Sequence, residues 1–200
     1  MKIRYEGNGS IALELLGKDP TLAPIFAKTA YVEFEIGTDY FYHLTGAIVT
    51  QQLSSKVADA IFQRLLNFTN NYLSPTKIAM ASNEELRALG LSYRKMEYLK
   101  LLASRFLDSP GLFENIGKKN DEEVIATLCE LKGIGRWTAE MFLMFTLGRE
   151  DVFSAGDYGL KRALSILYNK PVDEKEASAI AEKWKPYRSV VSHFLWHFLE

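Results

Sequence analysis

A short glycine-containing string between two amphipathic segments is the feature that most constrains this chain. Leu131-Lys-Gly-Ile-Gly-Arg-Trp-Thr-Ala139 interrupts apolar residues that recur at helical spacing from 121 to 148. Because glycine tolerates positive φ and has no side chain, the string predicts a tight hairpin with Ile134 buried between two helices. The amides that follow Gly135 open the second helix, where a phosphate binds favourably. A plain helix–helix turn with glycine caps is the alternative, but the length of the string favours the phosphate-binding hairpin.

The remainder of the sequence predicts an all-α fold, because apolar residues recur mostly at helical spacing. A serine at 54 or 55 and the capping box Ser82-Asn-Glu-Glu85 mark helix starts. Alternation over Tyr31–Ile36 predicts a strand for which no partner is evident. Helices are expected near 39–50, from 54 or 55 to 68, from 75, at 82–90, 92–108, 121–131, up to 147, and at 158–168, 173–183 and 187–200.

The composition limits what the chain can do. With 200 residues, 48% of them hydrophobic, it has enough apolar side chains for one large domain or two packed subdomains. A formal net charge of -1 gives no basic footprint, which counts against bulk electrostatic coating of nucleic acid. Main-chain amides of a hairpin bind phosphate without a lysine-rich surface. The charge is therefore compatible with a local grip on a few phosphates.

Metal and disulfide chemistry has little support. The single Cys129 forms no intramolecular disulfide and holds no zinc or iron–sulfur cluster alone, and its helical surroundings predict a buried, inert thiol. His43, His193 and His197 show no metal-site spacing, and the aromatic residues between the last two favour a packed helix. The chain shows no signal peptide and no membrane-length apolar run, so we expect a soluble, intracellular (cytoplasmic) protein.

Residues 121–162 resemble the helix-hairpin-helix and Gly/Pro-Asp loop of the DNA glycosylase superfamily. The match continues through Asp151-Val-Phe-Ser-Ala-Gly-Asp-Tyr-Gly-Leu-Lys-Arg162, where the resemblance implies that Asp157 is the catalytic carboxylate. The loop lacks the proline that often precedes this aspartate. From the residues alone, Ser154-Ala-Gly-Asp157 also reads as a capping box with Asp157 as its third-position carboxylate.

Trp137 bears on which chemistry the resemblance implies. Bifunctional members carry a lysine two residues after the second hairpin glycine, and that lysine forms a Schiff base with the sugar. An indole is no such nucleophile, so no AP lyase activity is expected. Lys132 lies before the glycines, in a different register, and is not assigned that role.

Three separated motifs are similar to the 3-methyladenine DNA glycosylase II (AlkA-type) branch, in a compact form without the separate N-terminal domain. They are the hairpin string, Thr50-Gln-Gln-Leu-Ser54, and the segment from Trp184 to Trp196. The resemblance covers about 40–200 and implies excision of N-alkylated purines such as 3-methyladenine in base excision repair. A glycosylase for deaminated or oxidised bases and a non-catalytic helix-hairpin-helix DNA-binding module are the alternatives.

The resemblance also assigns roles and subdomains. It implies a central helical subdomain at about 40–115, packed closely against 1–39 plus 116–200, with the hairpin at 121–148, the Asp loop at 149–160 and the active-site cleft between the subdomains. Gln52 is the expected intercalating side chain and Leu53 its apolar alternative; another interpretation is that Gln51 and Gln52 cap the helix near Ser54. Trp184 is expected in the core. The base pocket is expected to comprise Trp137, Met141, Tyr158 and Trp196, and the DNA-binding set Gln51, Gln52, Leu53, Ser54, Gly133, Ile134, Gly135, Arg136 and Thr138.

The expected partner is double-stranded DNA that contains damaged bases, bound by a monomer. No cofactor is expected, except that the resemblance allows a monovalent cation in the hairpin loop. Met141 stands where an aromatic residue can occur in the branch, so the base preference is left open.

Overall fold

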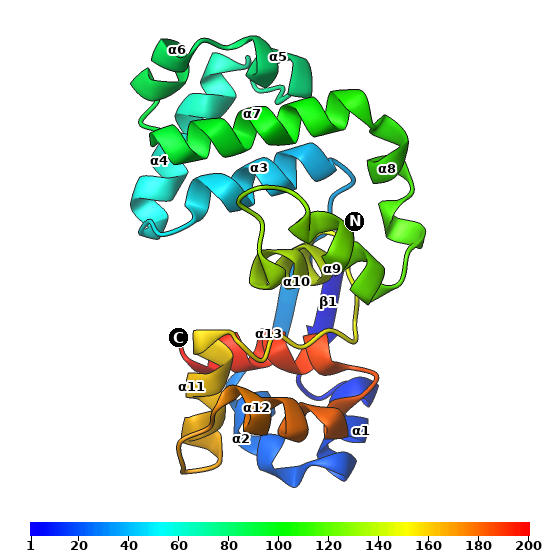
Figure 1. The fold of residues 1–200 in the computed structure, drawn as a ribbon. Coiled ribbons are helices and arrows are strands. Elements are labelled where there is room, and N and C mark those ends of the chain that lie inside the picture. The colour runs from blue at the N-terminus through cyan, green and yellow to red at the C-terminus, as the bar shows by residue number, and fades with distance from the viewer. The chain divides into compact units, whose positions relative to one another are not determined.

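The computed structural model describes residues 1–200, apart from the side chain of Ser55. The chain forms two compact units, which are described separately: unit 1 comprises residues 1–36 and 143–200, and unit 2 comprises residues 37–142 (Figure 1). Among the described residues the only sheet has two strands, and the predicted helical fold is confirmed.

Unit 1 contains that small sheet. β1 (Lys2–Glu6) pairs antiparallel with β2 (Tyr31–Glu35), with Lys2 opposite Glu35 and Glu6 opposite Tyr31. The strand predicted at 31–36 therefore does have a partner, and the expectation that it lacked one was wrong. β1 gives only a weak alternation signal in the sequence, because just two of its five residues, Ile3 and Tyr5, point toward the half-buried face.

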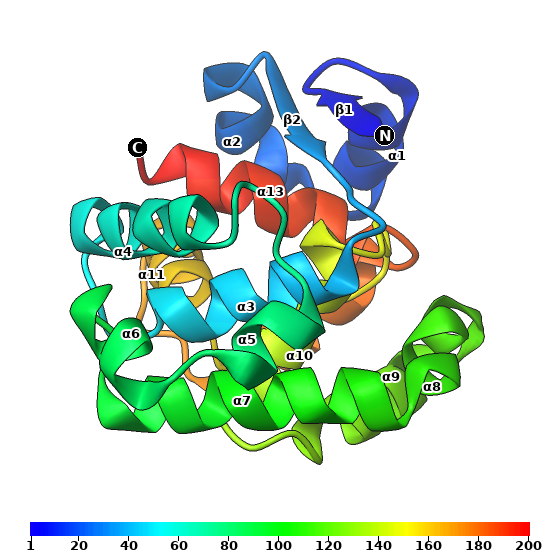
Figure 2. The same ribbon diagram turned by 90° about the horizontal axis from the view of Figure 1, so that it is seen from above.

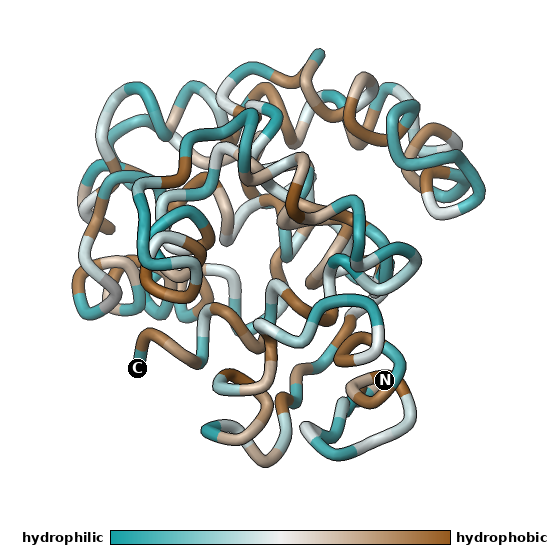
Figure 3. The backbone as a smooth tube through the Cα atoms, turned by 90° about the horizontal axis from the view of Figure 1, so that it is seen from below, coloured by the Kyte–Doolittle hydropathy of each residue, from teal (hydrophilic) through white to brown (hydrophobic). Residues whose placement is uncertain are grey.

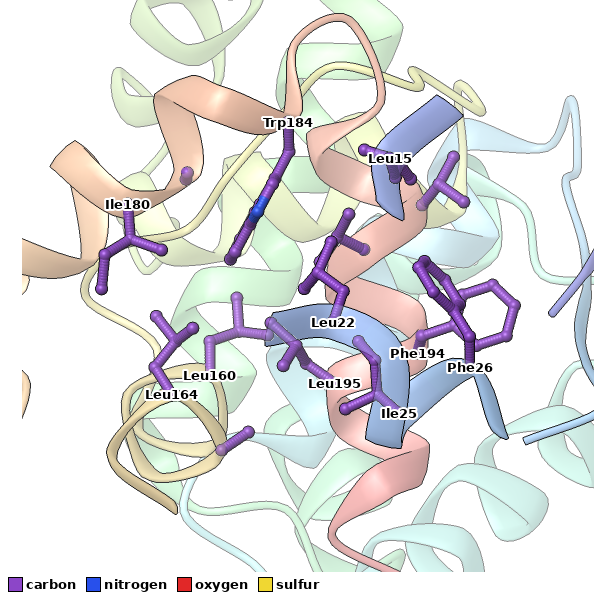
Figure 4. Packing of buried hydrophobic residues seen from close by; sticks show 14 of the residues in the cluster. Leu15, Leu22, Ile25, Phe26, Leu160, Leu164, Ile180, Trp184, Phe194 and Leu195 are labelled. Atoms are coloured by element: carbon purple, nitrogen blue, oxygen red, sulfur yellow. The ribbon is translucent and has the colours of Figure 1, made fainter. Parts of the chain in front are cut away.

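Five helices and a buried cluster build the rest of unit 1. The helices are α1 (Ser10–Lys18), α2 (Ala23–Lys28), α11 (Tyr158–Leu167), α12 (Glu174–Ala181) and α13 (Arg188–Phe198), with 3-10 turns at Pro20–Leu22 and Glu182–Trp184. Figure 4 shows Trp184 pointing into the cluster and Phe26 against Phe194 of α13, whose ring centroids lie 4.9 Å apart. Trp184 is 0% exposed, so its predicted core position is confirmed. This core holds α11 and α13 together, the two helices that carry Asp157 and Trp196.

Unit 2 is built on α3, which lies between α4 and α7 (Figure 2). Hydrophilic and hydrophobic residues follow one another at short intervals along the chain (Figure 3), as expected of amphipathic helices. Its helices are α3 (Tyr40–Thr50), α4 (Ser55–Phe68), α5 (Pro75–Met80), α6 (Asn83–Ala88), α7 (Tyr93–Asp108), α8 (Pro110–Glu114) and α9 (Asp121–Cys129), with a 3-10 turn at Ile116–Lys118; α10 (Arg136–Phe145) begins in unit 2 and ends in unit 1.

Several helix starts agree with the expected caps. Ser82 and Glu85 form the predicted capping box of α6, and Asn120 caps α9 in the same way. Ser54 occupies the N-cap position of α4 without a side-chain cap hydrogen bond, and the side chain of Ser55 lies outside the described residues.

The hairpin segment 116–142 lies in unit 2, whereas the sequence placed it with the terminal segments. The cause is a set of contacts that tie the hairpin to α7 and to the end of α3. Lys132 pairs with Glu97 of α7, and the Gln51 amide donates to the Gly133 carbonyl. Such contacts between distant segments leave no local signal in the sequence.

Cys129 is exposed, so the prediction of a buried thiol was wrong. It is the last residue of α9, and the register of that helix turns Val124, Ile125 and Leu128 inward. Across the described residues, no helix is long and apolar enough to cross a membrane.

Candidate active site and DNA-binding hairpin

Asp157 lies at the N-terminus of α11 in unit 1. Its Oδ1 accepts a hydrogen bond from the Leu160 N–H at 2.8 Å, so Asp157 is the N-cap of this helix. The alternative interpretation, with Asp157 at the third position of a box begun by Ser154, was wrong. The Asp157 N–H donates to the Ser154 carbonyl at 3.0 Å in a turn, and α11 begins only at Tyr158. The residue is 8% exposed, and its carboxylate lies at the positive end of the helix dipole.

The loop before Asp157 is fastened to α13 despite its missing proline. The Ser189 hydroxyl accepts from the Val152 N–H at 2.9 Å and donates to the Val152 carbonyl at 3.1 Å. The Arg188 guanidinium binds the Asp151 carboxylate through Nε at 2.7 Å. These contacts hold the loop against the start of α13.

Trp196 of α13 lies beside Asp157. Its Nε1–H donates to the same Oδ1 atom at 3.0 Å, and its ring stacks on Phe145 at 5.6 Å. Gly159 leaves room for this pair: a Cβ there would lie 3.1 Å from both Asp157 Oδ1 and Trp196 Cδ1. Two donors on one oxygen orient the carboxylate, and the indole N–H is used for that purpose. The expected role of Trp196 as a wall of the base pocket stays a prediction.

His193, one turn earlier on α13, is buried in an aromatic cluster. It stacks on Phe34 at 4.2 Å and meets Phe145 edge-on, and its Nε2 has no hydrogen-bond partner. Burial, followed by the nearby His197, lowers the pKa of His193 to about 4. The His197 Nδ1 lies 3.0 Å from the His193 carbonyl, so the pair is part of a packed helix.

The low pKa of His193 predicts acid sensitivity. The unfolded chain takes up a proton near pH 6.5 and the folded chain only near pH 4, so the unfolded state binds more protons between those values. Stability should therefore fall as the pH drops through this window, by about 2 kcal/mol between pH 7 and pH 5. Urea unfolding of wild type and His193→Phe at both pH values measures this. An equal pH slope in both proteins would contradict it.

In unit 2 the hairpin turns at Gly133. This residue has φ +93°, and a Cβ on it would lie 2.2 Å from Cδ2 of Tyr98 in α7. The Ile134 N–H donates to the Leu131 carbonyl at 3.0 Å, and the Ile134 side chain is buried as predicted. Gly135 is exposed and needs no positive φ, so only the first glycine is conformationally required. The hairpin presents the start of α10, the geometry that the phosphate-binding prediction requires.

Two side chains expected at the DNA are engaged elsewhere in unit 2. The Arg136 guanidinium binds Glu122 of α9 at 2.8 Å and Glu140 at 2.9 Å, which raises the Arg136 pKa, chiefly through the hydrogen bond to Glu122. Arg136 thus ties α9 to α10. Thr138 is buried, and its predicted DNA role stays a prediction.

The four expected pocket residues are divided between the units. Trp137, half of it exposed at 50%, and the half-buried Met141 are one turn apart on α10 in unit 2 and share a face of that helix. Tyr158, 77% exposed, and Trp196 belong to unit 1 with Asp157. Trp196 contacts the carboxylate through its indole N–H, and the pocket as a set stays a prediction.

The loop between α3 and α4, residues 51–54, carries the side chains that are expected to intercalate into DNA, and it is called the probe loop below. Gln52 is exposed in a left-handed conformation, with φ +56°, and Leu53 beside it is 37% exposed. Gln51 is half-buried, and its Nε2 donates to the Gly133 carbonyl at 2.8 Å. Because that amide is bound to the hairpin, Gln51 does not cap α4.

The hairpin cation stays a prediction. The Leu131 carbonyl accepts the Ile134 N–H and the Gly133 carbonyl accepts Gln51, so each of these oxygens has one lone pair in use. No cluster of histidine, cysteine or carboxylate ligands occurs in the described part of the chain.

Sequence reasoning missed several residues that support the site. Lys95 and Tyr98 of α7 hold the probe loop and the hairpin, and they have no motif of their own. Gly159 did leave a signal, because a glycine in the first turn of a helix is unfavourable unless something requires it.

Comparison with known proteins decides the family. Residues 45–187 match the model of the HhH-GPD superfamily base excision DNA repair protein. The chain belongs to this superfamily. The matched range contains the hairpin, the Asp157 loop and the probe loop, so the predicted family is confirmed.

Relatives within the HhH-GPD superfamily bear the name of the predicted branch. The DNA-3-methyladenine glycosylase of Saccharomyces cerevisiae is 35% identical over 96% of this chain and 80% of its own length. DNA-3-methyladenine glycosylase 2 of Escherichia coli is 30% identical over 77% of this chain and 53% of its own length.

Solved structures give the same result. A DNA-3-methyladenine glycosidase from Bacillus halodurans superposes with a TM-score of 0.86 and 34% identity, covering 98% of this chain and 91% of the other. The Schizosaccharomyces pombe 3-methyladenine DNA glycosylase Mag1, in complex with abasic DNA, has a TM-score of 0.81 and 29% identity, covering 94% and 95%.

Proposed function

We propose that this HhH-GPD protein is a monofunctional DNA glycosylase that hydrolyses the N-glycosidic bond of N-alkylated purines such as 3-methyladenine. The observation that carries the proposal is the Asp157 carboxylate, held by two donors at the start of α11. The names of the relatives support the substrate class, and the S. pombe complex with abasic DNA supports binding to DNA that has lost a base. The protein is expected to act as a monomer on intracellular DNA.

The chemistry begins with a base outside the helix, at a cost of about a few kcal/mol for unstacking. Alkylation gives the purine a positive charge, so the C1′–N bond breaks with its electron pair going to the base, which leaves neutral. The sugar becomes oxocarbenium-like, and a carboxylate stabilises that charge. Water then bonds to C1′ and loses its proton to Asp157 or solvent. Each step runs without an amine nucleophile.

In this proposal the hairpin binds the phosphate backbone of the DNA. The start of α10 offers main-chain N–H groups to a phosphate, which suits a chain with a net charge of -1. The exposed Gln52, with Leu53 beside it, fills the gap left by the displaced nucleotide. Trp137 offers its exposed face to a flipped cationic base, a contact worth about 1–2 kcal/mol when desolvated.

A set of lesion duplexes tests the function. Duplexes with 3-methyladenine, hypoxanthine, uracil or 8-oxoguanine are incubated with the protein, and strand breaks are measured with and without hot alkali. We expect breaks only at 3-methyladenine and only after alkali, with no adduct trapped by borohydride.

Any other result of this experiment would favour an alternative function. Breaks at another lesion would identify a glycosylase for deaminated or oxidised bases. A trapped adduct would overturn the monofunctional assignment. Binding without any release would leave a DNA-binding module.

A further inference from the structure

α7 contacts both loops of unit 2 that the proposed function places at the DNA, namely the probe loop and the hairpin. Lys95 lies in its first turn, and its Nζ donates to the carbonyls of Val49 at 2.7 Å and Gln51 at 2.8 Å. A cation at these carbonyls stabilises the C-terminal end of α3. Burial lowers the pKa of Lys95. The start of the probe loop is therefore fixed to α7.

The hairpin is fixed to the same helix. Tyr98 lies one turn after Lys95, and its ring packs against the Cα of Gly133 so closely that no side chain fits there. Lys132 adds an exposed ion pair with Glu97 at 2.6 Å. One turn of α7 thus supports both the probe loop and the hairpin.

Gln51 joins the two loops directly. Its carbonyl is held by Lys95 and its side chain by the Gly133 carbonyl at 2.8 Å, so both ends of the residue are fixed. The next residue, Gln52, is left in a left-handed conformation with its side chain exposed. Such a conformation in a residue other than glycine persists only when its surroundings determine it.

We propose that Gln51 and Lys95 are positioning residues that hold the probe tip Gln52–Leu53 at a set distance from the hairpin. This inference rests on the proposed function. A phosphate held by the hairpin then fixes where the tip enters the duplex. The tip fits where a nucleotide has left the stack and is excluded where the stack is intact. The contacts of Gln51 and Lys95 therefore contribute to the preference for damaged over undamaged DNA, in addition to the binding of phosphate by the hairpin.

Gln51→Met tests this, because methionine has a similar length and no N–H donor. Affinities are measured for a duplex with a tetrahydrofuran abasic-site analogue and for an undamaged duplex of the same sequence. Loss of one hydrogen bond should lower the ratio of the two affinities by about tenfold. Lys95→Met should lower the same ratio, and the double variant should lose less than the product of the single losses. Gln63→Met, which removes an exposed amide hydrogen-bonded to Asn67 on α4, is the matched control and should keep the wild-type ratio.

Each outcome decides the inference. A wild-type ratio in Gln51→Met would overturn it. Equal weakening on both duplexes together with a lowered Tm would mean a merely structural role and would also overturn it. A wild-type protein that shows no preference for the abasic analogue would overturn the proposed function and this inference together.

Discussion

Replacing Asp157 by asparagine is expected to slow release of the alkylated base by about a hundredfold or more. The amide keeps the size of the side chain and loses the negative charge that stabilises an oxocarbenium-like sugar. Asparagine also caps helices as well as aspartate does, and its oxygen still accepts from Leu160 and Trp196. The loss should therefore appear in the single-turnover rate and leave the Tm close to that of the wild type.

Asp173→Asn is the matched control for this effect. Asp173 caps α12 in the same unit, accepting the Glu176 N–H at 2.8 Å, and it has no part in the proposed chemistry. We expect wild-type activity from it. If Asp157→Asn released base as fast as this control, the catalytic role of Asp157 would be lost, and the residue would be only a helix cap.

Replacing Gly133 by alanine is expected to lower the free energy of unfolding by about 2–4 kcal/mol. The new Cβ would lie 2.2 Å from the Tyr98 ring, and the backbone at φ +93° disfavours any side chain. Urea denaturation measures the loss. DNA affinity should fall as well, because the hairpin is displaced from α7.

Gly135→Ala provides the comparison two residues away. A Cβ there meets nothing within 4 Å and the backbone is not left-handed, so the change in stability should stay within about 1 kcal/mol. Adding Tyr98→Ala to Gly133→Ala should recover part of the loss by removing the clash while the strain in φ remains. Equal stabilities for the two glycine variants would contradict the account of the turn.

The features that the sequence predicted are those that depend on near neighbours. The hairpin, the capping box of α6 and the amphipathic helices each follow from residues within a few positions, where spacing and glycine chemistry determine the geometry. Asp157 was found through a resemblance between ordered motifs. From the residues alone it was equally a helix cap, and the structure shows that it is a helix cap too.

The features that the sequence could not predict depend on distant neighbours. Gln51 reaches Gly133 across 82 positions and Trp196 reaches Asp157 across 39. Tertiary packing decides which partners meet, and it also paired β1 with β2 and left Cys129 at the surface. From the sequence, Gln51 was expected to contact DNA and Trp196 to contact the base. In the structure, the Gln51 amide donates to the Gly133 carbonyl and the Trp196 indole donates to Asp157.

The most direct measurement is the appearance of free base from methylated duplex DNA, separated by chromatography under single-turnover conditions. We expect free 3-methyladenine to appear in equal amounts with abasic sites, the strand to stay intact until alkali is added, and Asp157→Asn to release little. Strand cleavage without alkali, or free 3-methyladenine at the wild-type rate from Asp157→Asn, would contradict a carboxylate that acts without a covalent partner.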